Sequence, residues 1–357
     1  MKTQEPFKYT ANELYTWLTN QPDFILLDVR NEKDFANFAV EGPECIPYIN
    51  IPYFDFIEDV PGSVAKVPKG KKVRVVCAQE GSAKFVGEQL MANGFADVGY
   101  MEGGIKSWGN MLSPIKVSQD ESFALYQMIR PGKASLSYLL ISNGEAAVFD
   151  PSRNIPVYKA FIDSEKTRLV KSFETHRQAD YISGSVRLSR DHGIETIGRD
   201  EDFRGADFPY TPAGDNDVFS VGGVEIKAIH TPGHTLGSVC YLIANTYLLS
   251  GDTIFIESAG RPDLGGKCAE WSRYLYLTLM ITIKDLPDDL VVLPGHYTSW
   301  SEANADLIFM DSLGNLKKTN NAFQYIHEGK FAAFIADNIR PQPEIYADIR
   351  KMNAGWM

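Results

Sequence analysis

The stretch that decides the fold is Thr175-His176-Arg177-Gln178-Ala179-Asp180-Tyr181, which places a His and an Asp directly after a predicted strand, residues 170–173. Three later segments have the same form, because each follows a predicted strand (225–229, 247–249 or 291–293) and carries a His or an Asp. These segments are Thr231-Pro232-Gly233-His234-Thr235, Ser250-Gly251-Asp252-Thr253 and Pro294-Gly295-His296-Tyr297. Imidazole and carboxylate groups are good metal ligands. We therefore expect the strand ends to deliver these side chains to one edge, as a metal site.

The four segments, in this order and spacing, resemble the metallo-β-lactamase superfamily, whose first loop normally reads T-H-x-H-x-D-H. In this chain Gln178 stands at the second His of that loop and Tyr181 at the third. An amide oxygen and a neutral phenol are poor metal ligands. The two-metal hydrolases of the superfamily bind one ion through three His and the other through Asp, His and a bridging Asp. This chain can complete neither ligand set.

The persulfide dioxygenase branch of the superfamily needs fewer ligands. Resemblance to this branch implies a single non-haem iron held by His176, His234 and Asp252. Two imidazoles and one carboxylate leave open positions, where a thiolate-type substrate and dioxygen can meet. Fe(II) is thus the expected metal if the site is retained. Zn(II), or no metal at all, are the alternatives that the altered loop leaves open.

Other polar residues are expected beside these ligands. A metal-bound imidazole usually donates its second N–H to a carboxylate or carbonyl, so Asp180 and His296 are expected to hold the ligands in place. We expect Tyr181 to hydrogen-bond a bound water or the substrate. Arg261 either faces an anionic substrate or forms an ion pair with Asp263 that fixes its loop. The residues expected to support the ligands or contact substrate are Gln178, Asp180, Tyr181, Arg261 and His296.

The N-terminal third contains a second candidate site, centred on Cys77. The β-branched residues 73–76 predict a strand that ends at this Cys, and residues 84–93 predict a helix with its apolar side chains on one side. Backbone N–H groups in the intervening loop, before a helix N-terminus, stabilise anions. Cys77 is therefore a candidate for a stabilised thiolate or persulfide.

The sequence around Cys77 resembles a rhodanese sulfurtransferase domain, with Leu26-Leu27-Asp28-Val29-Arg30 and Met101-Glu102-Gly103-Gly104-Ile105-Lys106-Ser107-Trp108 as that family's landmarks. The resemblance implies that Cys77 is the catalytic residue and carries a sulfane sulfur as a persulfide. Many rhodaneses have an Arg five residues after the Cys, but this chain has Ser82 there and Glu80 in the loop. The loop is less electropositive, so thiosulfate is a poor candidate donor.

A chain of 357 residues exceeds what one hydrophobic core usually organises, so two domains are expected. We assign residues 1–113 to the rhodanese-like domain, 114–122 to a polar linker, and 123–357 to the metallo-β-lactamase-fold domain with a C-terminal helical tail. The fold class is α/β: a parallel sheet with helices, followed by an αββα sandwich. Asn143-Gly144 and Gly222-Gly223 predict hairpins in the second domain. A capping box, Thr10 to Glu13, predicts a helix in the first domain.

The tail of the chain extends the resemblance. Residues Arg340-Pro341-Gln342-Pro343-Glu344-Ile345-Tyr346 and Met352-Asn353-Ala354-Gly355 are similar to the tail of bacterial fusion proteins in which a rhodanese domain precedes a metallo-β-lactamase fold. Those relatives normally keep the full T-H-x-H-x-D-H loop, so this chain departs from them at its metal site.

Composition narrows the partners and the location. A net charge of −11 and a pI near 5.1 argue against a nucleic-acid partner. Residues 1–5 lack the basic start of a leader, and no apolar run is long enough to span a bilayer, so a cytoplasmic protein with no membrane partner is expected. Four unpaired Cys fit a reducing compartment. The oligomeric state is open, and a homo-oligomer is compatible with the sequence.

Together the two resemblances imply a protein of sulfur metabolism. The expected reaction is oxidation of a low-molecular-weight persulfide, such as glutathione persulfide, to sulfite, coupled to sulfane-sulfur transfer at Cys77. Its small-molecule partner would be a thiol or a persulfide. One alternative is a rhodanese-type sulfurtransferase with a metal-free, non-catalytic scaffold as its second domain. The other is a mononuclear zinc hydrolase.

Overall fold

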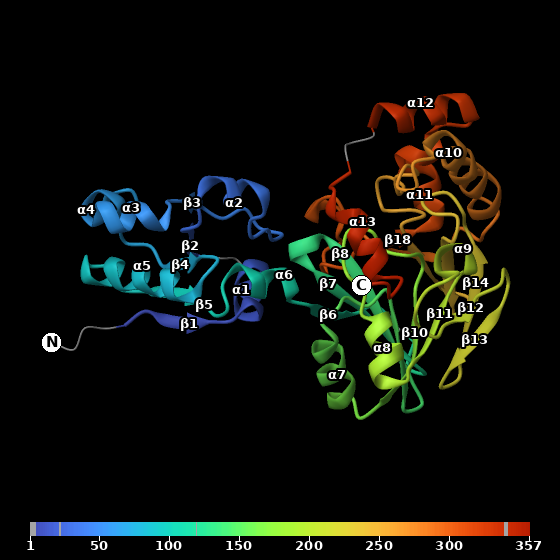
Figure 1. Cartoon of the computed structure of the whole chain (residues 1–357), viewed down its shortest axis with the longest axis horizontal. Helices are drawn as coiled ribbons and strands as arrows, with labels where there is room; N and C mark the ends of the chain where they lie inside the picture. The colour runs from blue at the N-terminus through green and yellow to red at the C-terminus, as the bar shows by residue number, and fades with distance from the viewer. Residues whose placement is uncertain (1–4, 21–22, 119, 339–341) are drawn as a thin grey trace. The chain divides into compact units, whose positions relative to one another are not determined.

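The computed structural model describes residues 5–20, 23–118, 120–338 and 342–357, which form two compact units (Figure 1). The first unit contains Met1–Ser113 and Arg130–Ala134, and the second contains Pro114–Ile129 and Ser135–Met357. Two stretches used in the sequence analysis lie outside the described residues. They are residues 1–4, at the start of the sequence, and Arg340 and Pro341 of the tail segment. No helix in the described part of the chain is both long and apolar enough to cross a membrane.

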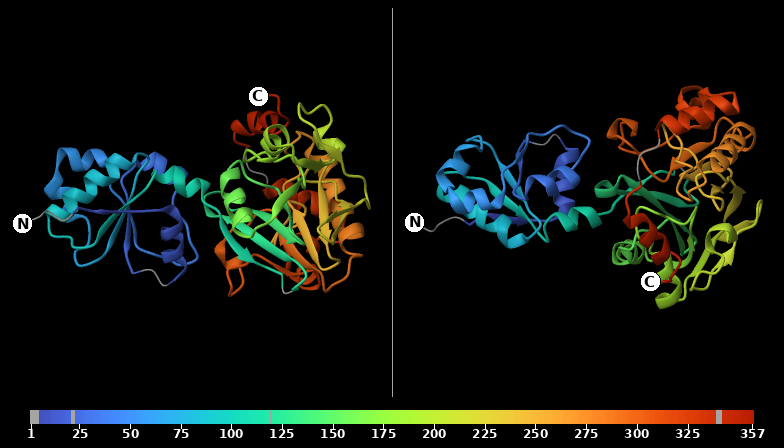
Figure 2. Two further views of the ribbon diagram at one scale, coloured as in Figure 1. Left: turned by 90° about the horizontal axis from the view of Figure 1, so that it is seen from below. Right: turned by 45° about the horizontal axis from the view of Figure 1, so that its top comes forward.

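A five-stranded parallel sheet forms the centre of the first unit, in the order β1-β5-β4-β2-β3. Figure 2 shows helices on both sides of this sheet, as the alternating pattern predicts. The strands are β1 (Phe7–Tyr9), β2 (Ile25–Asp28), β3 (Tyr48–Asn50), β4 (Val73–Val76) and β5 (Val98–Met101). The helices are α1 (Ala11–Thr19), α2 (Glu32–Asn37), α3 (Tyr53–Glu58), α4 (Val60–Ala65), α5 (Glu80–Ala92) and α6 (Ile105–Asn110).

The first residues of helices α1 and α5 can be compared with those predicted from the sequence. Thr10 and Glu13 form the predicted capping box at the start of α1. Helix α5, in contrast, begins at Glu80 rather than at residue 84. Its first turn closes through a hydrogen bond from the Ala83 N–H to the Gln79 carbonyl. Because residues 80–82 are polar or small, apolar periodicity could not reveal that turn.

The second unit consists of two sheets packed face to face. The first sheet has the order β12-β11-β10-β9-β8-β7-β6 and the second has the order β13-β14-β15-β16-β17-β18. Phe149 of β9 stacks on Phe173 of β10, and both contact Tyr241 of β15, so these rings fill the space between the sheets. The strands of the first sheet are β6 (Ser113–Lys116), β7 (Ala124–Arg130), β8 (Ser135–Ser142), β9 (Glu145–Phe149), β10 (Arg168–Phe173), β11 (Glu195–Gly198) and β12 (Thr211–Pro212). Those of the second are β13 (Val218–Val221), β14 (Val224–His230), β15 (Val239–Ile243), β16 (Tyr247–Gly251), β17 (Val291–Pro294) and β18 (Asp311–Ser312).

Helices cover the outer surfaces of the two sheets, which gives the expected αββα arrangement (Figure 1). Residues of α10, α11 and α12 form one apolar cluster with residues of β14 to β17. The helices of this unit are α7 (Ile155–Ser164), α8 (Ser185–His192), α9 (Asp200–Phe203), α10 (Cys268–Leu277), α11 (Leu313–Thr319), α12 (Glu328–Asn338) and α13 (Ile345–Met352).

Both predicted hairpins are confirmed, β8–β9 and β13–β14. Asn143 and Gly144 have φ values of 48° and 78°, the left-handed conformation that a tight hairpin turn requires. The strands expected before the four candidate segments are also confirmed, as β10, β14, β16 and β17.

The expected linker, residues 114–122, is not wholly irregular. Pro114 to Lys116 belong to β6, the edge strand of the first sheet. The Val117 N–H then donates to the Leu125 carbonyl, which continues the pairing with β7. A short polar strand at a sheet edge lacks an apolar pattern, so its sequence looks like that of a linker.

Candidate functional site

Three of the predicted ligands meet at one rim of the second unit. His176 follows β10, His234 follows β14 and Asp252 follows β16. The Nε2 atoms of His176 and His234 lie 3.9 Å and 3.6 Å from the same carboxylate oxygen, Oδ2 of Asp252. One ligand atom from each residue lies within 4.8 Å of the others. This is the grouping that a single metal ion requires.

Hydrogen bonds on the far side of each ring determine which His nitrogen faces the Asp. Thr175 Oγ1 donates its only proton to Asp150 Oδ2 (2.8 Å), so it accepts the Nδ1–H of His176 (3.0 Å). The Nδ1–H of His234 donates to the carbonyl of Arg261 (2.9 Å). Both rings therefore direct Nε2 toward Asp252. Fixing the tautomer in this way is typical of metal-binding His.

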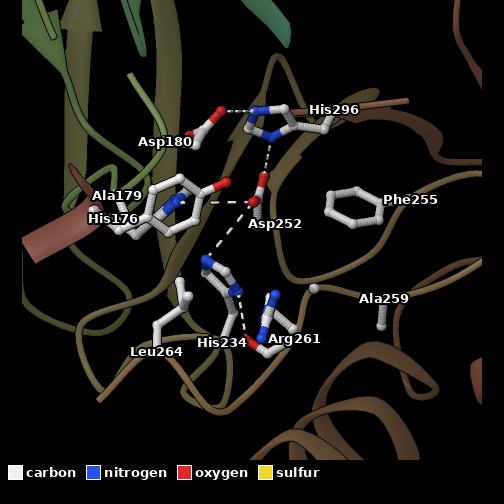
Figure 3. A pocket seen from close by; sticks show the side chains of 12 residues that line it. His176, Ala179, Asp180, His234, Asp252, Phe255, Ala259, Arg261, Leu264 and His296 are labelled. Carbon is white, nitrogen blue, oxygen red and sulfur yellow. Dashed lines mark hydrogen bonds and ion pairs between the residues drawn. The ribbon is translucent and has the colours of Figure 1, made fainter. Parts of the chain in front are cut away.

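His296 and Asp180 hold the carboxylate ligand, as expected for supporting residues. The Nδ1 atom of His296 lies 2.8 Å from Oδ1 of Asp252, and its Nε2 atom lies 3.2 Å from Oδ2 of Asp180. Because carboxylates can only accept, both ring nitrogens of His296 carry protons. One oxygen of Asp252 is thus occupied, and the other is left for a metal (Figure 3).

The electrostatics of the cluster favour metal binding. Burial lowers the pKa of His176 to about 4, so its imidazole is neutral and can act as a ligand. Burial alone would lower the pKa of His296, but the carboxylates of Asp252 and Asp180 outweigh it and raise that pKa well above the ordinary value. Burial would raise the pKa of Asp252, yet the charge of His296 and its hydrogen bond hold it well below the usual range. Asp252 is therefore an anion.

A cavity of about 290 Å³ opens onto this cluster (Figure 3). Its walls include three apolar or aromatic side chains, Phe255, Leu264 and Tyr346. Tyr346 belongs to the tail segment quoted from the sequence, whereas Phe255 lies in none of the motifs. Gly260 allows the close approach of its loop, because a Cβ atom there would lie 2.8 Å from His234 Nδ1. A small molecule could therefore reach the open side of the metal ligands.

The two replaced positions of the loop do not line this cavity. The side chain of Gln178 interacts with the carboxylate of Asp150 and lines a separate small cleft. Tyr181 donates from its hydroxyl to the main-chain carbonyl of Asp150 (3.1 Å), rather than toward a position for water or substrate. Both side chains are buried. The loop therefore lacks two of the family's ligand positions. The side chains that replace them do not cover the three candidate ligands His176, His234 and Asp252.

A residue from the other end of the chain fixes the altered loop. Asn353 is 2% exposed, and its Nδ2 donates to the carbonyls of Gln178 and Tyr181, each at 2.9 Å. Its Oδ1 accepts the N–H of Ser183 at 2.8 Å. The tail segment containing Asn353 was noted in the sequence, but no local signal linked it to a loop about 170 residues earlier.

Of the two roles that the sequence allowed for Arg261, contact with an anionic substrate or an ion pair with Asp263, the structure shows the ion pair. Its Nε and Nη2 each lie 2.6 Å from an oxygen of Asp263, in a two-point ion pair. This pair shapes the loop whose carbonyl orients His234. Arg261 is also among the residues that line the cavity.

Cys77 lies in the first unit, directly after β4, and is 6% exposed. Only Ala78 and Gln79 separate it from helix α5. The Ile105 N–H donates to the Cys77 carbonyl (2.8 Å), and Gly104 has a φ of 62°. A Cβ atom at Gly104 would lie 2.6 Å from that carbonyl oxygen. The carboxylate of Glu80 accepts a hydrogen bond from the Gly103 N–H (3.0 Å). Glu80 is therefore held against the segment Met101 to Trp108, one of the two rhodanese-like segments quoted from the sequence.

Comparison with known proteins finds two family matches, one in each of the two units of the structure. Residues 10–111 match the rhodanese-like domain, and residues 130–296 match the metallo-beta-lactamase superfamily. A hydroxyacylglutathione hydrolase of Pelagibacter ubique is 30% identical over 174 residues, which cover 48% of this chain and 70% of the relative.

Solved structures include similar proteins. A metallo-beta-lactamase from Staphylococcus aureus has a TM-score of 0.62 and 28% identity, covering 66% of this chain and 74% of that protein. ETHE1 from Myxococcus xanthus has a TM-score of 0.58 and 22% identity, covering 65% of this chain and 99% of that protein, and this likeness concerns the fold.

The residues present fit one metal ion, because two imidazoles that each direct Nε2 toward one anionic carboxylate converge with it beside a cavity. They do not fit two ions, since Gln178 and Tyr181 face away. The segments that carry these ligands lie within the matched region. The chain belongs to the metallo-β-lactamase superfamily and has a rhodanese-like domain at its N-terminal end.

Proposed function

We propose that the protein oxidises a low-molecular-weight persulfide to sulfite at an Fe(II) site and transfers sulfane sulfur at Cys77. The overall oxidation balances as RSSH + O2 + H2O giving RSH and H2SO3, so the sulfane sulfur is oxidised and dioxygen is reduced. We further propose that the protein is cytoplasmic, acts on a thiol compound, and has neither nucleic acid nor membrane as a partner.

The observation that carries this proposal is the ligand set. His176, His234 and Asp252 face one cavity, whereas Gln178 and Tyr181, the two replaced positions of the loop, point elsewhere. Two His and one carboxylate with open positions are typical of non-haem Fe(II) oxygenases. The name of the Pelagibacter relative adds that a glutathione compound is a reasonable substrate class.

Iron, when bound, would supply sites at which the persulfide and dioxygen are brought together. The chain itself holds the ligands. Thr175 and the Arg261 carbonyl orient the two imidazoles, and His296 keeps the Asp252 carboxylate ionised and aligned. Phe255 and Leu264 make the cavity partly apolar and reduce access of water to a reactive persulfide.

Cys77 would act separately in the first unit. Its thiolate attacks the outer sulfur of RSSH, the S–S bond breaks, and RSH leaves with Cys77 as a persulfide. The reverse step returns the sulfur to a thiol. A diffusible thiol can therefore connect the two reactions.

The decisive experiment measures oxygen uptake and sulfite formation by the full chain, reconstituted with Fe(II), in the presence of glutathione persulfide. We expect one sulfite per dioxygen, loss of both signals in His234→Ala, and retention of both in Cys77→Ser. A protein that binds no iron and consumes no oxygen, yet transfers sulfur through Cys77, would instead be a sulfurtransferase with a scaffold domain.

A zinc hydrolase is the second candidate, favoured by the hydrolase name of the 30% identical relative. One zinc ion on the same three ligands could activate water. Cleavage of a hydroxyacylglutathione thioester by the Zn(II) protein, independent of oxygen, would support this alternative and contradict the dioxygenase.

A further inference from the structure

A second cavity, of about 450 Å³, lies beside the metal-site cavity in the second unit. Arg177, the residue after the ligand His176, lines it together with Arg350 of α13 and Trp271 of α10. Leu264, visible in Figure 3, lines both cavities. The two cavities are therefore neighbours that share one apolar wall residue.

The second cavity has hydrogen-bond donors that lack acceptors. The buried atoms Nε of Arg177, Nη1 of Arg350 and Nε1 of Trp271 have no hydrogen-bond partner among the described residues. Burying an N–H group without a partner is unfavourable, and more so when the group is charged. Three such atoms on residues that line one cavity indicate a ligand that accepts hydrogen bonds.

The charges at this cavity are also unbalanced. Arg177 and Arg350 line the same cavity, and burial and then the charge of Arg177 lower the pKa of Arg350. Asp202 is the acidic residue on the wall, but its carboxylate already accepts hydrogen bonds from main-chain and hydroxyl groups. The donors are the N–H of Arg177 (2.8 Å), the hydroxyl of Thr235 (2.8 Å) and the N–H of Gly237 (3.2 Å). An anion between the guanidiniums would relieve their repulsion.

The volume of the cavity exceeds what a lone small ion needs and falls within the range of small-molecule sites. We propose that Arg177, Arg350 and Trp271 bind an oxyanion group, carboxylate or phosphate, of an organic ligand. We infer that this ligand is the thiol compound whose sulfur reaches the metal-site cavity past Leu264, an assignment that rests on the proposed function. Guanidinium groups suit this role because they bind oxyanions at two points.

The test measures binding by calorimetry to the full chain without added iron, with S-methylglutathione, inorganic phosphate and acetate as probes. We expect S-methylglutathione to bind. Arg177→Gln and Arg350→Gln should each weaken binding roughly 10- to 100-fold, the effect of losing one charge-assisted hydrogen bond. The matched control is Arg187→Gln, on an exposed Arg of α8 that pairs with Asp191. Binding by the control should equal that of the wild type.

Thermal melting separates a binding role from a structural one. S-methylglutathione should raise the melting temperature of the wild type and of Arg350→Lys, which keeps the charge, but not that of Arg350→Gln. A structural Arg would lower the melting temperature in Arg350→Gln while leaving the ligand-induced increase unchanged. That result, or absence of binding by all three probes at about 10 mM, would overturn the proposal.

The probes and the oxygen assay distinguish the possible failures. Arg-dependent binding of phosphate without S-methylglutathione would retain the oxyanion site and overturn the thiol assignment. Intact binding of S-methylglutathione in a protein that consumes no oxygen would refute the dioxygenase and leave the oxyanion site standing. Oxygen uptake with an unchanged KM for glutathione persulfide in Arg350→Gln would refute the thiol assignment alone.

Discussion

Replacing Asn353 by Ala should destabilise the second unit and weaken its metal site. The side chain makes three hydrogen bonds to buried main-chain groups, two to carbonyls of the altered loop and one from Ser183. At about 1 kcal/mol for each bond, the free energy of unfolding should fall by about 3 kcal/mol. For a unit of this size, that corresponds to a melting temperature lower by roughly 6 to 12 °C. The loop also carries His176, so metal affinity should fall about tenfold or more.

Circular dichroism melting and a competitive metal titration measure these two effects. Asn315→Ala is the matched control, because the exposed side chain of Asn315 donates to the Asp311 carboxylate at the surface and its loss should change stability by less than about 0.5 kcal/mol. Asn353→Asp keeps the acceptor for Ser183 but sets a carboxylate against two carbonyls, so it should be at least as destabilising as the Ala variant. If Asn353→Ala melts and binds metal as the wild type does, the tail does not hold the loop, and this reasoning is refuted.

Three further predictions concern single positions. Gln178→Ala should leave the metal stoichiometry at about one per chain, because this side chain faces Asp150, and elemental analysis would detect a lower value. His296→Ala should weaken metal binding roughly 10- to 100-fold by releasing Asp252, and an unchanged dissociation constant would contradict that role. Gly104→Ala should destabilise the first unit by about 2 to 4 kcal/mol and slow sulfur transfer at Cys77, because φ is positive and the new methyl group meets a carbonyl. A wild-type melting curve and transfer rate would rule out that packing.

Elements with strong local signals could be predicted from the sequence. The Asn143-Gly144 turn requires left-handed backbone, and a short apolar run lies on each side of it, so the β8–β9 hairpin could be predicted. The same holds for the capping box at α1, where two side chains bind backbone groups three residues apart. Edge strand β6 was missed because it is short and has a single apolar side chain besides a Pro, and the first turn of α5 because its residues are polar or small.

At the candidate metal site, too, some features could be predicted from local sequence and others could not. The ligand types and their place after strands are local properties, and they were sufficient to nominate His176, His234 and Asp252. The roles of Gln178 and Tyr181 were not readable, because a side chain in a loop can turn toward the site or away from it. Packing against Asp150 decides this, through contacts between segments about 30 residues apart.

The sequence by itself determined the resemblance of each part of the chain to its family, the two hairpins and the three metal-ligand candidates, because each depends on residue types at short spacing. Only the tertiary structure decided that Asn353 holds the altered loop, that His296 occupies one oxygen of Asp252, and that Arg177 and Arg350 share a cavity. These contacts join residues that lie from 44 to more than 170 positions apart. Their partners are chosen by how sheets and helices pack, and no short pattern in the chain encodes that choice.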